Sequence, residues 1–224
     1  KQIISELKSV VGVFKVNSIF TRYGLQIVEE IQKAGCRTFL DLKFHDIPNT
    51  VANYARAAAR MGIYMFNVHC SGGLEMMEAA VKAAEDEAEK MGFDRPLILG
   101  VTVLTSIDKE TLNKDLNVNG KIEGQVVRLA ELAKKAGLDG VVASAKEVLP
   151  IRKACGRDFV VLTPGIRPQW SAPDDQKRVV TPADAIRNGS DFIVIGRPIL
   201  KAVKYNMTRL EAANRVLKEI QEAV

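Results

Sequence analysis

Short apolar runs alternate with longer amphipathic stretches along most of the chain. The runs are almost continuously apolar and rich in β-branched residues, which is typical of parallel strands buried on both faces of a sheet. Seven such runs occur, at residues 11–16, 38–42, 65–69, 98–102, 140–143, 160–162 and 192–195. They predict seven strands.

The stretches between the runs repeat their apolar positions with a helical period. The clearest examples are residues 2–8, 24–34, 75–91, 124–136 and 208–224. Several of these segments end in an Ala-Gly or Met-Gly pair, which predicts a glycine in the left-handed conformation that closes a helix. These pairs are Ala34-Gly35, Met61-Gly62, Met91-Gly92 and Ala136-Gly137. Strands that alternate with helices predict right-handed βαβ units and a parallel sheet.

Two architectures build a parallel sheet from such units. An open doubly wound sheet usually has a Gly-x-Gly-x-x-Gly turn after its first strand, and the sequence contains none. A (β/α)8 TIM barrel has eight strands, and a length of 224 residues suits a single one. The helical pattern at 2–8 precedes the first visible strand. We therefore predict one barrel domain over residues 1–224, with its first strand missing from the chain.

Composition narrows the class of protein. Hydrophobic residues make up 47% and charged residues 26%, as in ordinary globular proteins, and the net charge of +5 suits an anionic ligand. Scattered basic residues and only 6% aromatic residues argue against nucleic-acid binding. No apolar stretch approaches the ~20 residues that span a bilayer, and no signal peptide is evident. We expect a cytoplasmic protein that does not bind a membrane.

Cysteines and histidines suggest no metal or disulfide chemistry. Cys36, Cys70 and Cys155 are isolated and fit neither a disulfide framework nor a metal motif, so we expect buried free thiols. His45 and His69 are the only histidines, and we expect them to form local hydrogen bonds.

Two long connections, 105–124 and 164–182, follow predicted strands. In a barrel the segments after the strands lie on the catalytic face, so both are candidate lids. The second contains Trp170, which either packs over a closed lid or is exposed.

The strongest chemical signal is the run DLKFHDIPNT at 41–50, which begins at the end of the second predicted strand. Strand alternation places Asp41 and Lys43 on one side, and Lys15 ends the preceding strand. Asp46 follows on the loop. Because buried charges are costly unless they pair, we expect Lys15, Asp41, Lys43 and Asp46 to form an array of alternating charges. An ion-pair cluster that only closes the barrel rim is the alternative, although charges inside a barrel mouth are usually functional.

A phosphate site is predicted near the C-terminus. Gly196-Arg197 follows the last predicted strand, and Arg167 follows the strand before it. A glycine lets backbone N–H groups approach an anion, and arginine binds phosphate oxygens in a forked geometry. Barrels commonly bind phosphate with the loops after their last two strands. The alternative is a glycine required for packing and two solvated arginines.

Together these blocks resemble the orotidine 5′-phosphate decarboxylase family in its bacterial form, over essentially the whole chain. The run at 41–50 is the most specific match. Further matching blocks occur in order at 14–16, 68–73, 101–106, 162–168, 175–178 and 195–198. The resemblance implies decarboxylation of orotidine 5′-monophosphate to UMP in de novo pyrimidine synthesis. It also implies a homodimer that uses no metal and no cofactor.

The resemblance also implies a role for each matching residue. Lys43 opposes the charge that develops on the pyrimidine ring and then donates the proton, while Asp41 faces the substrate carboxylate. Lys15 keeps Asp41 charged and contacts the ribose. Asp46 and Thr50 reach into the site of the partner subunit. The remaining ligand contacts are implied for Thr105, Arg167, Gln176, Gly196 and Arg197.

The chain departs from the family pattern in three places. The family's first strand carries a ribose-binding aspartate that would lie before Lys1. Asn17 replaces the usual glycine, and residues 204–207 replace the usual Asp-Pro. We expect the last two changes to have no direct effect on the chemistry.

Two other functions remain open. Related barrels that decarboxylate or condense sugar phosphates share the Asp-x-Lys-x-x-Asp pattern and use Mg²⁺, but they need a further acidic ligand. The residues that follow Asp46 match the orotidylate enzymes instead. The third possibility is a catalytically inactive nucleotide-binding barrel, against which the intact Asp41 and Lys43 argue.

Overall fold

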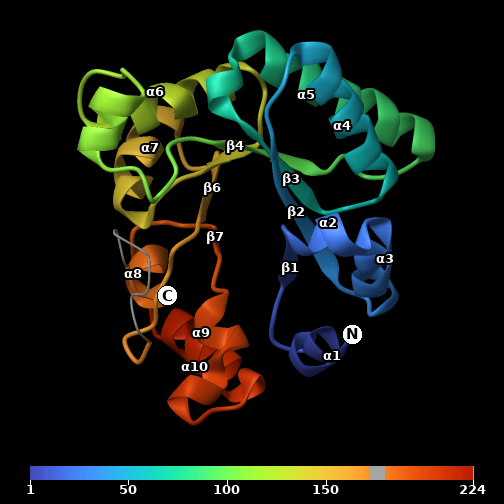
Figure 1. Ribbon diagram of the computed structural model, residues 1–224, viewed down its shortest axis with the longest axis vertical. Coiled ribbons are helices and arrows are strands. Elements are labelled where there is room, and N and C mark those ends of the chain that lie inside the picture. The colour runs from blue at the N-terminus through green and yellow to red at the C-terminus, as the bar shows by residue number, and fades with distance from the viewer. Residues whose placement is uncertain (172–179, 224) are drawn as a thin grey trace. The chain divides into compact units, whose positions relative to one another are not determined.

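The computed structural model describes residues 1–171 and 180–223, and it shows the expected alternation of strands and helices (Figure 1). The chain forms two compact units. The first unit comprises Lys1–Val101 and Leu132–Gly140, and the second comprises Thr102–Glu131 and Val141–Val224. The division falls within one helix and one strand, α6 and β5, whose bounds are given below.

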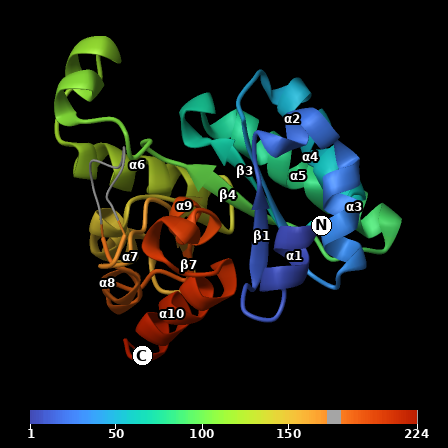
Figure 2. The ribbon, with the colours of Figure 1, turned by 60° about the horizontal axis from the view of Figure 1, so that its bottom comes forward.

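The first unit is built on four parallel strands with helices between them. The strands are β1 (Val13–Val16), β2 (Arg37–Phe44), β3 (Met65–His69) and β4 (Leu97–Val101). The helices are α1 (Gln2–Leu7), α2 (Ile19–Tyr23), α3 (Leu25–Lys33), α4 (Pro48–Arg60), η1 (Cys70–Gly72) and α5 (Leu74–Met91). Helices α3, α4 and α5 lie on the same side of these strands (Figure 2).

The second unit continues the same pattern, and its strands β6 and β7 are also parallel. Its elements begin with η2 (Thr111–Asp115), a π-helical turn, and α6 (Ile122–Lys135). They continue with β5 (Gly140–Val142), η3 (Ala145–Glu147), α7 (Val148–Cys155), β6 (Val160–Thr163), α8 (Pro182–Arg187), β7 (Phe192–Ile193), α9 (Arg197–Leu200), η4 (Ala202–Tyr205) and α10 (Arg209–Gln221).

All seven predicted strands are confirmed, and their order in the sheet is the order in the sequence, β1 to β7. Within the described residues no strand precedes β1. This succession is that of a (β/α)8 barrel without its first strand. The single-domain assignment stays a prediction.

Helix ends follow the predicted glycine signal. Gly35, Gly62, Gly92 and Gly137 all have positive φ, between 59° and 82°. Gly92 shows the reason, because it is the left-handed C-cap of α5 and its N–H donates to the Ala88 and Glu89 carbonyls.

Helix α4 ends at one of the predicted pairs, Met61-Gly62, with Met61 as its C-cap. Pro48 occupies the first turn, where its missing N–H costs nothing. The buried face of the helix consists of one valine and four alanines, which are Val51, Ala52, Ala55, Ala58 and Ala59.

The two predicted long connections differ from simple loops. In the first, Leu112 of η2 is buried and the Asn113 amide donates to the Val118 and Gly120 carbonyls at 2.8 and 3.1 Å. In the second, residues 172–179 lie outside the described part. The Trp170 ring packs edge-on against Tyr205, and Arg215 lies over its face. Trp170 is therefore part of the packing of the second unit, while the lid role of both connections stays a prediction.

The cysteines are free thiols, as predicted, and Cys70 and Cys155 are buried; the expected burial is wrong for Cys36, which is only partly buried. Burial raises the pKa of Cys70 to about 12, so this thiol is not a nucleophile at neutral pH. None of the described helices has both the length and the apolar character needed to cross a membrane.

Gly100 lies in a tightly packed part of the first unit. A Cβ atom at this position of β4 would lie 2.4 Å from the Cys70 sulfur and 3.1 Å from a Leu138 methyl carbon. Because close-packed interiors do not absorb an added carbon, the strand leaves room for glycine alone.

We expect Gly100→Ala to destabilise the protein by about 1–3 kcal/mol through overpacking. Gly124→Ala is the matched control, because a Cβ there meets nothing within 4 Å and α6 gains a better helix former. Chemical denaturation of both variants measures the difference. Equal stability of the two variants would contradict the packing argument.

Candidate functional site

The candidate site is centred on Asp41, near the end of β2. Asp41 is 8% exposed, and its carboxylate is bound by two ammonium groups and two amides. Lys15 Nζ donates to Oδ2 at 2.8 Å and Lys43 Nζ to Oδ1 at 2.6 Å. Asn17 donates to Oδ2 at 3.2 Å and Asn67 to Oδ1 at 2.7 Å. The first unit thus brings three of the four predicted charged residues into one network.

The network determines the charge of Asp41. Burial raises the pKa of its carboxyl, but the Lys15 charge and the hydrogen bonds from Lys15, Lys43 and Asn67 outweigh burial and hold the pKa below its ordinary value. A buried carboxylate with four donors is therefore ionised at neutral pH.

Lys43 reaches Asp41 by a different route from the predicted one. The predicted contact is present, but the regular strand geometry from which it was predicted is not, because Lys43 has a left-handed backbone with φ of +53°. The register also shifts: Leu40 pairs with Phe66, whereas Phe44 pairs with Val68, so four steps along β2 match two along β3. An irregularity of this kind re-aims a side chain, and here it directs Lys43 to the Asp41 carboxylate.

Asp46 does not join this network within the chain. Its carboxylate accepts a hydrogen bond from the Ile47 N–H at 2.7 Å, and among the described residues it forms no ion pair. The predicted array of four charges is therefore an array of three, with Asp46 exposed at the start of α4. Thr50 lies in the first turn of α4 and is half-buried.

The two histidines contact each other beside Lys43. The rings of His45 and His69 are 5.2 Å apart between centroids. Burial, His45 and Lys43 together lower the pKa of His69, so it is neutral at pH 7. Among residues 1–171 and 180–223, no group of three or more His, Cys, Asp or Glu side chains is arranged to hold a metal ion.

The predicted phosphate residues lie in the second unit. Arg167 follows β6 and is 5% exposed, and its guanidinium donates to the Ile166 carbonyl at 3.3 Å. Gly196 and Arg197 begin α9, just after β7. A Cβ at Gly196 would meet no atom of residues 1–171 or 180–223 within 4 Å, so packing against these residues does not require this glycine. Thr105 is half-buried after β4, and Gln176 lies outside the described residues.

Two asparagines of the network were not predicted as site residues. Asn17 was expected to have no direct effect on the chemistry, but its side-chain amide donates to the Asp41 carboxylate. Asn67 is fully buried and is the only polar residue among Met65–Val68 of β3. A polar residue inside an otherwise apolar strand is the signal that could have identified Asn67.

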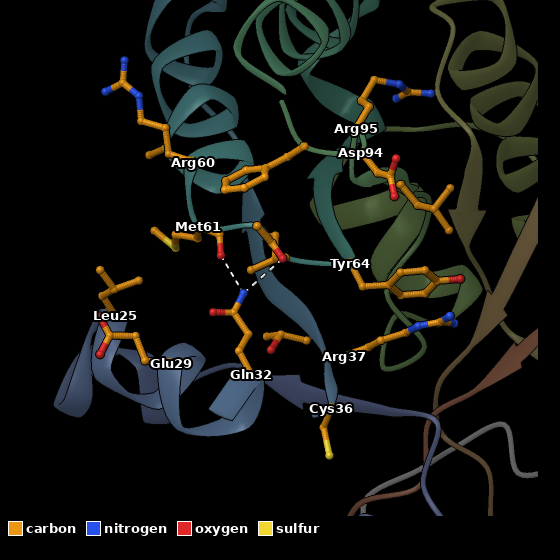
Figure 3. Close-up of a pocket in the computed structure, with 16 residues that line it drawn as sticks. Leu25, Glu29, Gln32, Cys36, Arg37, Arg60, Met61, Tyr64, Asp94 and Arg95 are labelled. Carbon is orange, nitrogen blue, oxygen red and sulfur yellow. Dashed lines mark hydrogen bonds between the residues drawn. The ribbon is translucent and has the colours of Figure 1, made fainter. Parts of the chain in front are cut away.

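The first unit also contains a pocket of about 960 Å³ near the amino-terminal ends of β2 to β4, and Asp41 is not among the residues that line it (Figure 3). Its polar side chains are largely occupied. Gln32 of α3 donates to the Met61 and Gly62 carbonyls after α4. Arg60 pairs with Glu87 at 2.6 Å, and Arg95 binds Asp139 through two nitrogens. These contacts join α3 to the end of α4, α4 to α5, and the segments that precede β4 and β5, so we take the Asp41 network as the candidate site.

Comparison with known proteins extends this description. The profile of the orotidine 5′-phosphate decarboxylase / HUMPS family matches residues 1–208. The chain is 48% identical over 222 residues to orotidine 5′-phosphate decarboxylase of Syntrophomonas wolfei, which covers 98% of this chain and 91% of the relative. It is 54% identical over 194 residues to the Geobacter metallireducens protein of the same name, and this match covers 86% of this chain and 80% of the relative.

A solved structure is also similar to the chain over nearly its whole length. The structure of orotidine 5′-phosphate decarboxylase from Lactobacillus acidophilus matches with a TM-score of 0.82 and 36% identity, covering 98% of this chain and 94% of that one. The predicted fold class is confirmed.

The lowered pKa of Asp41 predicts an acid-sensitive contribution to stability. An ionised Asp41 stabilises the fold above its ordinary pKa of 3.8, and this contribution is lost as the pH falls below that value. We expect the chain to be more stable than Asp41→Asn at pH 7, with the difference shrinking below pH 3.8.

Urea denaturation at a series of pH values measures this difference. Asp86→Asn, which removes an exposed carboxylate of α5, is the control for loss of a negative charge alone. A constant difference between the chain and Asp41→Asn at every pH would contradict the assigned network.

Proposed function

The chain belongs to the orotidine 5′-phosphate decarboxylase / HUMPS family, and we propose that its Lys15–Asp41–Lys43 network converts orotidine 5′-monophosphate to UMP and CO2. The observation that carries the proposal is the pair of lysine ammonium groups on one buried carboxylate, at 2.8 and 2.6 Å. Such an array offers fixed charge of both signs to a reacting group.

The proposed chemistry needs stabilisation of negative charge. When the bond between the pyrimidine ring and its carboxylate breaks, CO2 leaves and the electron pair stays on the ring carbon. The Lys43 ammonium stabilises this charge and donates a proton to the same carbon, which forms the C–H bond of UMP. The neutral Lys43 amine then recovers a proton from solvent.

Asp41 and Lys15 prepare the site for this step. The ionised Asp41 repels the substrate carboxylate more than it repels UMP, which has lost that group. Lys15 holds Asp41 in its charged form at 2.8 Å and contacts the ribose.

Phosphate binding is assigned to the second unit. In this proposal Arg167, Gly196 and Arg197 bind the phosphate, Gln176 assists them, and Thr105 lies near the pyrimidine. No atom of the described residues lies within 4 Å of the place that a Gly196 Cβ would take, which supports close approach of an anion to the backbone.

The active form in this proposal is a cytoplasmic, single-domain homodimer that needs no cofactor. Asp46 and Thr50 then complete the partner's site. The exposed Asp46 carboxylate at the start of α4 supports this assignment, because no cation of the chain's described residues pairs with it.

The other two functions predict different outcomes. A Mg²⁺-dependent enzyme of the same family would lose its activity in a chelator. An inactive nucleotide-binding barrel would bind UMP without turnover, even after the chain is extended by a first strand.

We expect the protein to convert orotidine 5′-monophosphate to UMP in excess EDTA, and Lys43→Ala to abolish turnover because the proton donor is lost. Ultraviolet absorbance of the pyrimidine follows the reaction. Lys33→Ala removes an exposed lysine of α3 and is the matched control. Full turnover by a folded Lys43→Ala variant would rule out the mechanism.

Arg197→Ala tests the phosphate site separately. We expect this variant to raise KM for orotidine 5′-monophosphate by about 10-fold or more, since a charge-assisted hydrogen bond contributes strongly to binding. Its effect on unphosphorylated orotidine is expected to be small. Arg187→Ala, which removes an exposed arginine of α8, provides the comparison. Equal losses with both substrates would place Arg197 outside the phosphate site.

A further inference from the structure

We propose that Asn67 is the positioning residue of the site: its side-chain amide holds the Lys43 backbone and the Asp41 carboxylate in one fixed arrangement. This inference rests on the proposed function. Nothing in the motif at 41–50 includes Asn67, which lies on the neighbouring strand.

The burial of Asn67 shows that its contacts matter. Its exposure is 0%, and its neighbours in β3 are the apolar Met65, Phe66 and Val68. A buried amide is costly unless its groups form hydrogen bonds. Asn67 uses its oxygen and its nitrogen on two different parts of the site.

The oxygen of Asn67 supports the unusual backbone of Lys43. The left-handed φ of +53° is disfavoured for a residue with a Cβ atom. The shift of register between Leu40 and Phe44 takes this part of β2 out of the regular ladder. Asn67 Oδ1 instead accepts the Lys43 N–H at 2.8 Å and satisfies that donor.

The nitrogen of Asn67 fixes the partner of the Lys43 side chain. Nδ2 donates to Asp41 Oδ1 at 2.7 Å, and the same oxygen binds Lys43 Nζ at 2.6 Å. One amide therefore connects to Lys43 twice, directly through its backbone and indirectly through Asp41. Such an arrangement limits where the ammonium can lie, which is what a preorganised proton donor requires.

Two variants separate positioning from simple packing. Asn67→Ala removes both contacts. Asn67→Asp keeps the shape and the acceptor for the Lys43 N–H but places a second carboxylate against Asp41. Thr38→Val is the matched control, because Thr38 is a buried polar residue at the other end of β2.

For Asn67→Ala we expect kcat to fall by about 10- to 100-fold, the loss typical of a hydrogen bond to a charged group, while KM and UMP affinity change by less than about threefold. For Asn67→Asp we expect the acid limb of the kcat–pH profile to move to higher pH, because adjacent carboxylates share a proton. Thr38→Val is expected to leave all these quantities unchanged.

Folded Asn67 variants with unchanged kcat and an unchanged pH profile would overturn the proposal, since a packing role alone would lower only stability. An NMR titration of the Asp41 carboxyl carbon is independent of turnover. The titration should show a raised pKa of Asp41 in Asn67→Ala, and an unchanged pKa would also overturn the proposal. If the unaltered protein failed to turn over the substrate, the proposed function would fall and this titration would still decide the role of Asn67.

Discussion

The site depends on keeping one buried carboxylate ionised. Asp41 is 8% exposed, and a lone carboxylate at that depth would tend to take up a proton. Four donors prevent this, and they come from β1, the residue after it, β2 and β3. Parallel order places the ends of these strands at one edge of the sheet, so the fold supplies the donors that the charge requires.

The arrangement of donors around Asp41 requires departures from regular strand geometry. β2 leaves the ladder before Phe44, Lys43 adopts a left-handed backbone, and β3 carries a buried amide in an apolar run. Each of these features is unfavourable for folding alone. Their concentration within a few residues of Asp41 is typical of a functional site, where local rules are broken for a chemical reason.

Periodicity and short motifs predicted much of this molecule. Buried apolar runs are distinctive, so all seven strands were predicted, and the charged residue types at 41–50 identified the centre of the site. Asn17 and Asn67 were not predicted as site residues because they meet Asp41 across 24 and 26 positions of sequence. Such contacts depend on register between strands, and the register here is irregular. Alternation alone predicted that Asp41 and Lys43 would meet, but not how.

Asp41 accepts hydrogen bonds from four donors, and these donors explain why the Lys43 ammonium and the Asp41 carboxylate can lie 2.6 Å apart without transfer of the proton. If the Lys43 proton moved to Asp41, the site would lose its carboxylate and its ammonium group together. The lowered pKa of Asp41 makes that carboxylate a poor acceptor for the proton. Lys15 adds a second positive charge, and the asparagine amides add donors that favour only the ionised form. Neutral amides achieve this without adding a further charge to the site, which is the physical basis of the positioning role proposed for Asn67 beside Lys43.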